Sequence, residues 1–185
     1  HVAWVHVTSF AGAGTDDEPL ELEKTDRGVV VSRWINGNMP SPYYAGLVKF
    51  TGKSDRLQHY EMCVPAIALN KSIYTPAGTG GDGKPITDLT YINISYNFMT
   101  PIDEDNTRYF WFQHRNTDPE DKVISDKMNA GARLAFEEDR SILENVHSGM
   151  KDKKTANIDL GLDAGAKQFR LMLRRLIDEE NQNNK

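Results

Sequence analysis

Apolar and polar residues alternate along much of the first two thirds of the chain, in segments rich in β-branched and aromatic side chains. This pattern predicts five strands, at residues 28–35, 45–51, 57–64, 89–99 and 107–115. Because no helical pattern lies between them, neighbouring strands are expected to pair antiparallel in one sheet. The glycine-rich stretch 76–85 is predicted to be a hairpin loop and not a phosphate-binding loop, since Lys84 is followed by Pro85 where such loops carry Ser or Thr.

After Pro119 the spacing of apolar residues changes to three and four, which predicts a long amphipathic helix. One face of that helix carries Met128, Ala132, Ala135, Asp139, Ile142 and Val146. A second helix is predicted from an N-cap at Asp163 through Ile177. The predicted fold class is α+β, a curved antiparallel sheet gripping a long C-terminal helix.

The composition narrows the class of protein. A chain of 185 residues with 38% hydrophobic residues is expected to form one domain over 1–185. Its 22 basic and 27 acidic residues give a net charge of -5 without a basic stripe, which argues against nucleic acid as a partner. No apolar run approaches the roughly 20 residues that span a bilayer, and the first residues do not resemble a signal peptide, so we expect no membrane partner and a cytoplasmic protein.

Asp139 is the residue that does not fit its helix, because its position is in step with Ala135 and Ile142 on the face that should meet the core. Burying an unpaired carboxylate costs several kcal/mol, so such a group is normally ion-paired, hydrogen-bonded or bound to a metal. Spacing alone leaves two interpretations open, a salt bridge to an arginine at the edge of the core and a metal ligand.

His1 and His6 supply an H-x4-H pair in the apolar segment HVAWVH. Five residues of regular helix place two side chains about 140° apart, so both reach one metal only where a helix bends or ends. Alone, the pair is also compatible with two hydrogen-bonded core histidines. Together with Asp139 it would give the two-histidine, one-carboxylate set of non-haem iron(II) enzymes, which leaves the opposite face of the metal open for dioxygen.

Four segments, in order, resemble the Rieske oxygenases of the vanillate O-demethylase, phenoxybenzoate dioxygenase and dicamba monooxygenase type. HVAWVH resembles the end of the family's N-L-x-D-x-x-H-x-x-x-x-H stretch, and MTPIDEDNTRYFWFQHRN resembles its T-P and Y-F-W strand pair. AFEEDRSILENVH resembles the helix that carries E-D-x-x-x-x-E, and DAGAKQFRLMLRRLIDEE resembles the closing helix. The resemblance covers nearly the whole chain.

The resemblance implies a catalytic domain of the helix-grip, Bet v1/START-like type, in which His1, His6 and Asp139 are catalytic and hold one mononuclear Fe(II). Such a domain oxygenates an aromatic substrate by ring hydroxylation or O-demethylation. It uses O2 and electrons that pass from a reductase or ferredoxin through a Rieske [2Fe-2S] cluster. Full-length members commonly form homotrimers.

The chain departs from the family pattern, because neither the C-x-H nor the C-x-x-H pair that holds the [2Fe-2S] cluster is present, and the family's aspartate three residues before the first iron histidine is not in this sequence. Its single cysteine, Cys63, cannot anchor such a cluster. We therefore expect a fragment that lacks the N-terminal Rieske domain, and that is inactive without it.

The substrate is expected inside the sheet, under the long helix. Candidate lining residues are Asn97, Phe98, Trp111 and Ala135, with core packing as the alternative for each. Arg33 is a candidate cation for an aromatic carboxylate, with a surface position as its alternative.

Two other classes of protein compete with the oxygenase interpretation. A sheet that grips a helix also makes a non-catalytic, hydrophobic-ligand-binding module. A copper monooxygenase with a histidine brace would bind metal through the amine and imidazole of His1, although the H-x4-H spacing and the single cysteine argue against it.

Overall fold

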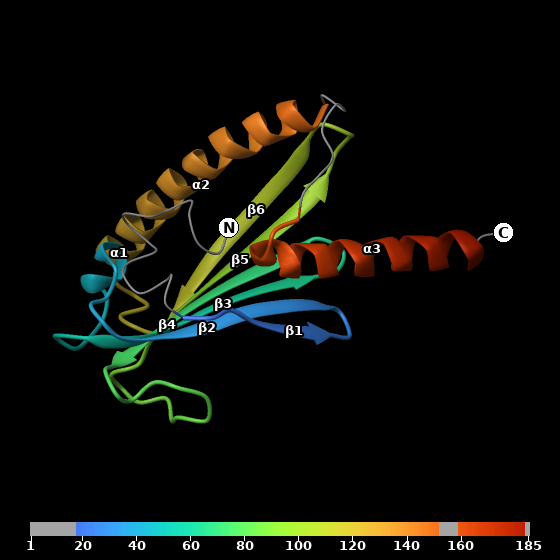
Figure 1. The fold of residues 1–185 in the computed structure, drawn as a ribbon. Helices are drawn as coiled ribbons and strands as arrows, with labels where there is room; N and C mark the ends of the chain where they lie inside the picture. The colour runs from blue at the N-terminus through green and yellow to red at the C-terminus, as the bar shows by residue number, and fades with distance from the viewer. Residues whose placement is uncertain (1–17, 152–158, 184–185) are drawn as a thin grey trace.

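The computed structural model describes residues 18–151 and 159–183, which form one antiparallel sheet and its helices (Figure 1). The strands lie side by side in chain order, each paired with the next. They are β1 (Glu21–Thr25), β2 (Gly28–Asn38), β3 (Ser54–Cys63), β4 (Ile67–Pro76), β5 (Tyr91–Pro101) and β6 (Thr107–Arg115). The helices are α1 (Pro42–Ala45), α2 (Lys122–Lys151) and α3 (Ala164–Asn183), with a 3-10 turn, η2 (Gly161–Asp163), before α3. The predicted α+β fold with an antiparallel sheet and a long helix is confirmed.

Four of the five predicted strands are present as β2, β3, β5 and β6, and the loop at 76–85 connects two paired strands as predicted. The predicted strand at 45–51 is wrong. Pro42 begins the short helix α1, whose first turn suits proline because the missing N–H has no partner there. The residues after α1 turn back, and Leu47 packs into the core instead of pairing with a strand.

The period of two along each strand gives the sheet two different faces. Asn97 of β5 is paired with Trp111 of β6, and the Trp111 ring contacts Phe136 of α2 at a centroid distance of 5.0 Å. Both side chains therefore lie on the face that α2 covers. The adjacent residue, Phe98, points to the opposite face, where its ring lies 5.9 Å from that of Phe112. The assignment of Phe98 to the space under the helix is wrong, because one step along a strand reverses the side chain.

The first half of α2 packs against the sheet and against α1. Met128, Ala132 and Ala135 are its buried residues. Met128 joins a cluster with three buried tyrosines and a leucine, Tyr44, Tyr74, Tyr91 and Leu47. Gly131 allows the close approach of α1, since a Cβ atom at this position would lie 2.5 Å from the ring of Tyr43.

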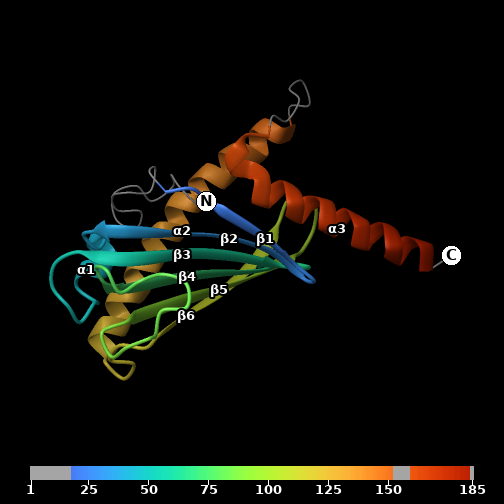
Figure 2. The same cartoon turned by 60° about the horizontal axis from the view of Figure 1, so that its bottom comes forward.

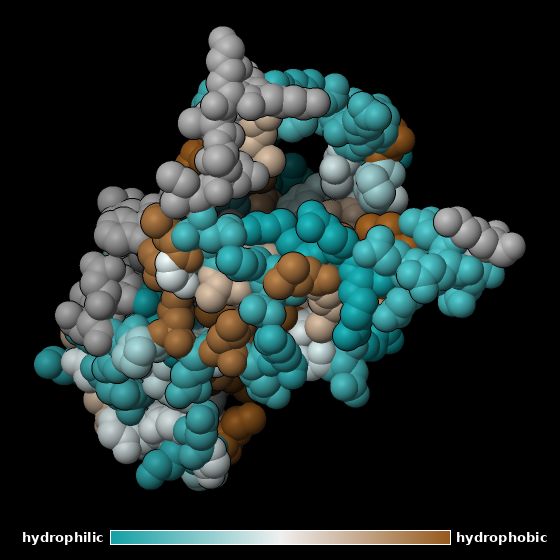
Figure 3. Space-filling view, turned by 45° about the vertical axis from the view of Figure 1, so that its right-hand side comes forward, coloured by the Kyte–Doolittle hydropathy of each residue, from teal (hydrophilic) through white to brown (hydrophobic). Residues whose placement is uncertain are grey.

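The second half of α2 leaves the sheet surface. Ile142 and Val146 are 46% and 50% exposed, so the predicted apolar face extends beyond the core that it was expected to meet. At its end the helix is tied to the β5–β6 hairpin, where Asp105 accepts from His147 Nε2 at 2.9 Å and pairs with Lys151 Nζ at 2.8 Å. A space-filling view shows hydrophobic side chains at the surface among hydrophilic ones (Figure 3).

The helix α3 begins directly after Asp163, whose carboxylate accepts a hydrogen bond from the Leu160 N–H at 2.8 Å. Gly165 seats the start of α3 on β2, because a Cβ atom there would lie 2.5 Å from Val31 Cγ2. The rest of the helix extends away from the sheet (Figure 2). None of the helices in the described part of the chain is both long enough and apolar enough to cross a membrane.

Candidate functional site

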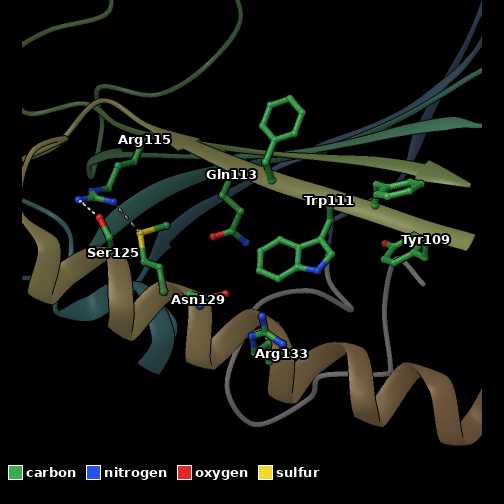
Figure 4. Close-up of a pocket in the computed structure, with 10 residues that line it drawn as sticks. Tyr109, Trp111, Gln113, Arg115, Ser125, Asn129 and Arg133 are labelled. Atoms are coloured by element: carbon green, nitrogen blue, oxygen red, sulfur yellow. Dashed lines mark hydrogen bonds between the residues drawn. The ribbon is translucent and has the colours of Figure 1, made fainter.

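A groove lies between the edge strand β6 and the helix α2 (Figure 4). Its volume is about 520 Å³, which falls within the range of small-molecule sites. Six of its ten lining residues come from the strand and four from the helix; they are Tyr109, Phe110, Trp111, Phe112, Gln113, Arg115, Ser125, Met128, Asn129 and Arg133. The groove is therefore lined by aromatic rings, two amides and two guanidinium groups.

Arg115 closes one end of the groove and holds β6 to the start of α2. Its Nη2 donates to the carbonyl oxygens of Asp118 at 2.7 Å and Asp121 at 2.8 Å, and to Ser125 Oγ at 3.0 Å. Its Nε donates to the Thr117 carbonyl at 2.9 Å. Because these acceptors use the donors of the guanidinium, Arg115 shapes the groove and has little capacity left for a ligand.

Tyr109 stands at the other end of the groove. Its hydroxyl donates to Asn97 Oδ1 at 2.6 Å, and Asn97 Nδ2 donates to the Ala68 carbonyl at 3.3 Å. Burial and, to a smaller extent, the negative charge of Asp139 raise the pKa of Tyr109 to about 12. The phenol is thus a protonated hydrogen-bond donor at neutral pH, and it lies within electrostatic reach of Asp139.

Asp139 is half-buried on α2, in line with the buried residues Ala132 and Ala135. It therefore lies on the side of α2 that faces the sheet, and its charge contributes to the raised pKa of Tyr109. A carboxylate in this position suits an iron(II) ligand. Over residues 18–151 and 159–183, however, no group of three or more His, Cys, Asp or Glu side chains is arranged to hold a metal. The described residues therefore do not form a three-ligand metal site by themselves.

His1 and His6 lie outside the described residues. The three-residue set of His1, His6 and Asp139 stays a prediction. The described geometry fits it in one respect, because Asp139 lies beside a groove with an aromatic wall and not on the outer side of α2.

The predicted pocket residues fall into three places. Trp111 lines the groove. Asn97 and Ala135, 2% and 8% exposed, are buried on the facing surfaces of sheet and helix, and their contact with a substrate stays a prediction. Arg33 is 5% exposed and its Nε donates to Gln58 Oε1 at 2.7 Å, so the alternative of a surface position is wrong.

Of the ten lining residues, only Trp111 was predicted for the pocket; those that were not predicted include the polar residues Tyr109, Gln113, Asn129 and Arg133. The strand residues could have been found from Trp111, because side chains two positions apart share a face. The two helix residues could not, because neither lies on the apolar face of α2 that the spacing indicates. Their role depends on which flank of the helix meets β6.

The covered face of the sheet is also unusually polar. Gln58, Asn93 and Ser95 are buried there, at 2%, 3% and 6% exposure. Within the described residues, Asn93 Oδ1 and the Tyr91 hydroxyl are buried without a hydrogen-bond partner. Buried polar atoms are normally paired, so this face has capacity for a polar ligand or ordered water.

A long helix across one face of an antiparallel sheet, with a groove between them, defines an α+β domain of the helix-over-sheet class. The chain belongs to the family of vanillate O-demethylase oxygenase C-terminal domains, whose model matches residues 1–179. The fold agrees with that of dicamba monooxygenase bound to 3,6-dichlorosalicylic acid, with a TM-score of 0.84 at 18% identity over 96% of this chain and 52% of that chain.

Two relatives place the family match in context. The chain is 32% identical to the toluene-4-sulfonate monooxygenase system iron-sulfur subunit TsaM1 of Comamonas testosteroni, over 98% of this chain and 53% of that protein. It is 25% identical to the vanillate O-demethylase oxygenase subunit of Pseudomonas sp. (strain ATCC 19151), over 97% of this chain and 56% of that protein. The chain thus spans about half the length of the relatives that it matches.

Proposed function

We propose that this chain is the catalytic domain of an aromatic-compound oxygenase, which uses O2 to hydroxylate or O-demethylate its substrate. The observation that carries the proposal is the position of Asp139 beside Tyr109, at the end of an aromatic groove, in a chain of this oxygenase family. The single domain 1–185 would be one part of a longer protein, as the share of the relatives that it covers suggests.

His1, His6 and Asp139 would hold one Fe(II), with two imidazoles and one carboxylate as its ligands. When bound, the iron would supply the activation of dioxygen. The Asp139 carboxylate fits this role by charge and by its half-buried position on the inward side of α2. The neighbouring Tyr109 keeps its proton at neutral pH and so adds no second negative charge next to Asp139.

The other residues of the site would position the substrate and exclude water. The rings of Tyr109 and Trp111 each contact Phe136 edge to face, at 5.3 Å and 5.0 Å. This gives the groove a stiff apolar wall against which an aromatic ring can lie. The hydrogen bond from Tyr109 to Asn97 fixes the end of that wall nearest Asp139.

The proposal also names partners for the full-length protein. Electrons would come from a reductase or ferredoxin through a Rieske [2Fe-2S] cluster in an N-terminal domain, in a homotrimer located in the cytoplasm. The relatives' names specify an aromatic sulfonate and an aromatic carboxylate, toluene-4-sulfonate and vanillate, so we propose an aromatic acid as the substrate.

A second function, a non-catalytic ligand-binding module, is favoured by the groove itself, because its lining of aromatic and polar side chains would hold an aromatic molecule without any metal. A test for catalytic turnover distinguishes the oxygenase from the ligand-binding module. Hydrogen peroxide carries oxygen at the level of dioxygen reduced by two electrons, so it can replace both O2 and the two electrons that the reaction needs. The chain would be loaded with ferrous iron and given vanillate, toluene-4-sulfonate and ¹⁸O-labelled peroxide.

Labelled oxygen in an aromatic product, or formaldehyde from vanillate, is the expected result by mass spectrometry. The product should be absent in the Asp139→Asn variant. Tight binding of the aromatic acids with no iron uptake would support the binding module and contradict the oxygenase proposal.

A further inference from the structure

Three polar side chains converge on the middle of the groove. Gln113 projects from β6 toward α2, and Asn129 and Arg133 project from α2 toward the strand (Figure 4). Asn129 and Arg133 are four residues apart, so they lie one above the other on the same flank of the helix. The two amides and the guanidinium together present several N–H donors to one small volume.

These donors have no partner among residues 18–151 and 159–183. Arg115, the other guanidinium of the groove, is held by backbone carbonyls. Further along α2, Arg140 pairs with Glu144 at 2.8 Å. Arg133 has Glu137 one turn away, yet it makes no hydrogen bond or ion pair with a described residue, and neither do the side chains of Gln113 and Asn129. The groove therefore contains one positive charge that the described fold does not use.

Trp111 lies between this cluster and the Asp139 end of the groove, on the strand, with its ring over Phe136. Arg133 and Asp139 are six residues apart on α2, which corresponds to about 9 Å along the helix axis and about 120° around it. Along the axis, this rise is comparable to the length of a para-substituted single-ring aromatic. A ligand with its acidic group at Arg133 and its ring on Trp111 would direct its far end toward Asp139.

We propose that Arg133, with Gln113 and Asn129, binds the oxyanion of an aromatic acid and so selects substrates by charge and sets their direction in the groove. The inference rests on the proposed function, which it deepens by assigning the residues that recognise the acid. Sulfonate and carboxylate share the chemistry, since both accept paired hydrogen bonds from a guanidinium. The protein as a whole carries a charge of -5, so a local cation would favour the binding of an anion in this groove.

Calorimetric binding to the iron-free chain tests the assignment separately from catalysis. The ligands are toluene-4-sulfonate, 4-methylbenzoate and the uncharged 4-methylphenol. Arg133→Gln should weaken the binding of the two acids by roughly 10- to 100-fold, as expected for a charge-assisted contact, and leave 4-methylphenol unchanged. Arg133→Lys should recover part of the loss, because the charge remains and the paired geometry does not.

Arg140→Gln is the matched control, since it removes an exposed arginine from the same helix outside the groove, and it should bind all three ligands as the wild type does. The stronger of the two acids in the wild type identifies the preferred head group. Equal binding of the acids by wild type and Arg133→Gln, an equal loss for acids and phenol, or no binding of either acid to the wild type would overturn the proposal. If Arg133→Gln weakens the binding of the acids as expected but the wild-type chain neither takes up iron nor forms product, only the proposed function is contradicted.

Discussion

The Tyr109 hydroxyl lies 2.6 Å from Asn97 Oδ1, and this contact joins the edge strand of the sheet to its interior beside Asp139. Asn97 is almost completely buried and keeps its second hydrogen bond, to the Ala68 carbonyl, from its amide nitrogen. Among the described residues, Tyr109 therefore provides the hydrogen bond to the buried amide oxygen of Asn97.

Replacing Tyr109 with Phe should lower the free energy of unfolding by about 1–2 kcal/mol, because it leaves the Asn97 oxygen buried without a donor. Urea denaturation followed by circular dichroism measures the change. Tyr96→Phe is the matched control on the opposite face of β5, and it should change the stability by less than about 0.5 kcal/mol. An equal effect of the two substitutions would show that the hydrogen bond to Asn97 contributes nothing specific.

Two glycines of α2 give opposite predictions. Gly131→Ala should destabilise the protein by about 1–2 kcal/mol, since the new methyl group would lie 2.5 Å from the Tyr43 ring and outweigh the gain in helix propensity. Gly149→Ala, with no atom within 4 Å of its Cβ position, should stabilise it by up to about 1 kcal/mol. Thermal unfolding of both variants provides the comparison. A stabilising Gly131→Ala would mean that α1 does not pack this closely on α2.

The stability should fall on acidification partly through His59. Burial lowers the pKa of His59, and the positive charge of Lys71, its partner across β3 and β4, lowers it further. The folded protein then binds the proton less readily than the unfolded chain, whose histidine has a pKa of 6.5. This contribution is complete above about pH 6.5 and is lost as the pH falls below it.

His59→Gln should therefore show a smaller drop in Tm between pH 7.5 and pH 5.5 than the wild type. The comparison uses differential scanning calorimetry at constant ionic strength. An unchanged slope of Tm against pH would show that His59 does not contribute to the loss of stability at low pH, which would then come from acidic groups.

The sequence predicted much of the fold because period two and period three-to-four spacing are local properties. The prediction failed where the pattern of apolar and polar residues does not match the position of those residues in the folded protein. The strand β1, of sequence ELEKT, is an edge strand with little burial and hence no alternation to detect. Residues 45–51 alternate like a strand, but the helix that begins at Pro42 places Leu47 in the core from a turn.

The groove was predictable only in part, because Trp111 was the one lining residue named in advance. Asp139 stood out because a carboxylate on an apolar helix face is costly, and its role as a ligand stays a prediction. Phe98 was assigned to the wrong face of the sheet because consecutive strand residues point to opposite faces. The apolar residues around Phe98 do not show which of the two faces it occupies. Arg133 and Gln113 come together only through the packing of α2 beside β6, and no pattern along the chain encodes that pairing.

Iron content after reconstitution tests the central claim most directly. The wild-type chain, incubated with ferrous iron without oxygen and then desalted, should retain roughly one iron per chain, and His6→Ala and Asp139→Asn should each lose most of it. Glu137→Gln, two residues away on α2, is the control and should keep it. Equal iron in Asp139→Asn and wild type, with both proteins folded by circular dichroism, would contradict the assignment of Asp139 as a ligand and with it the oxygenase account.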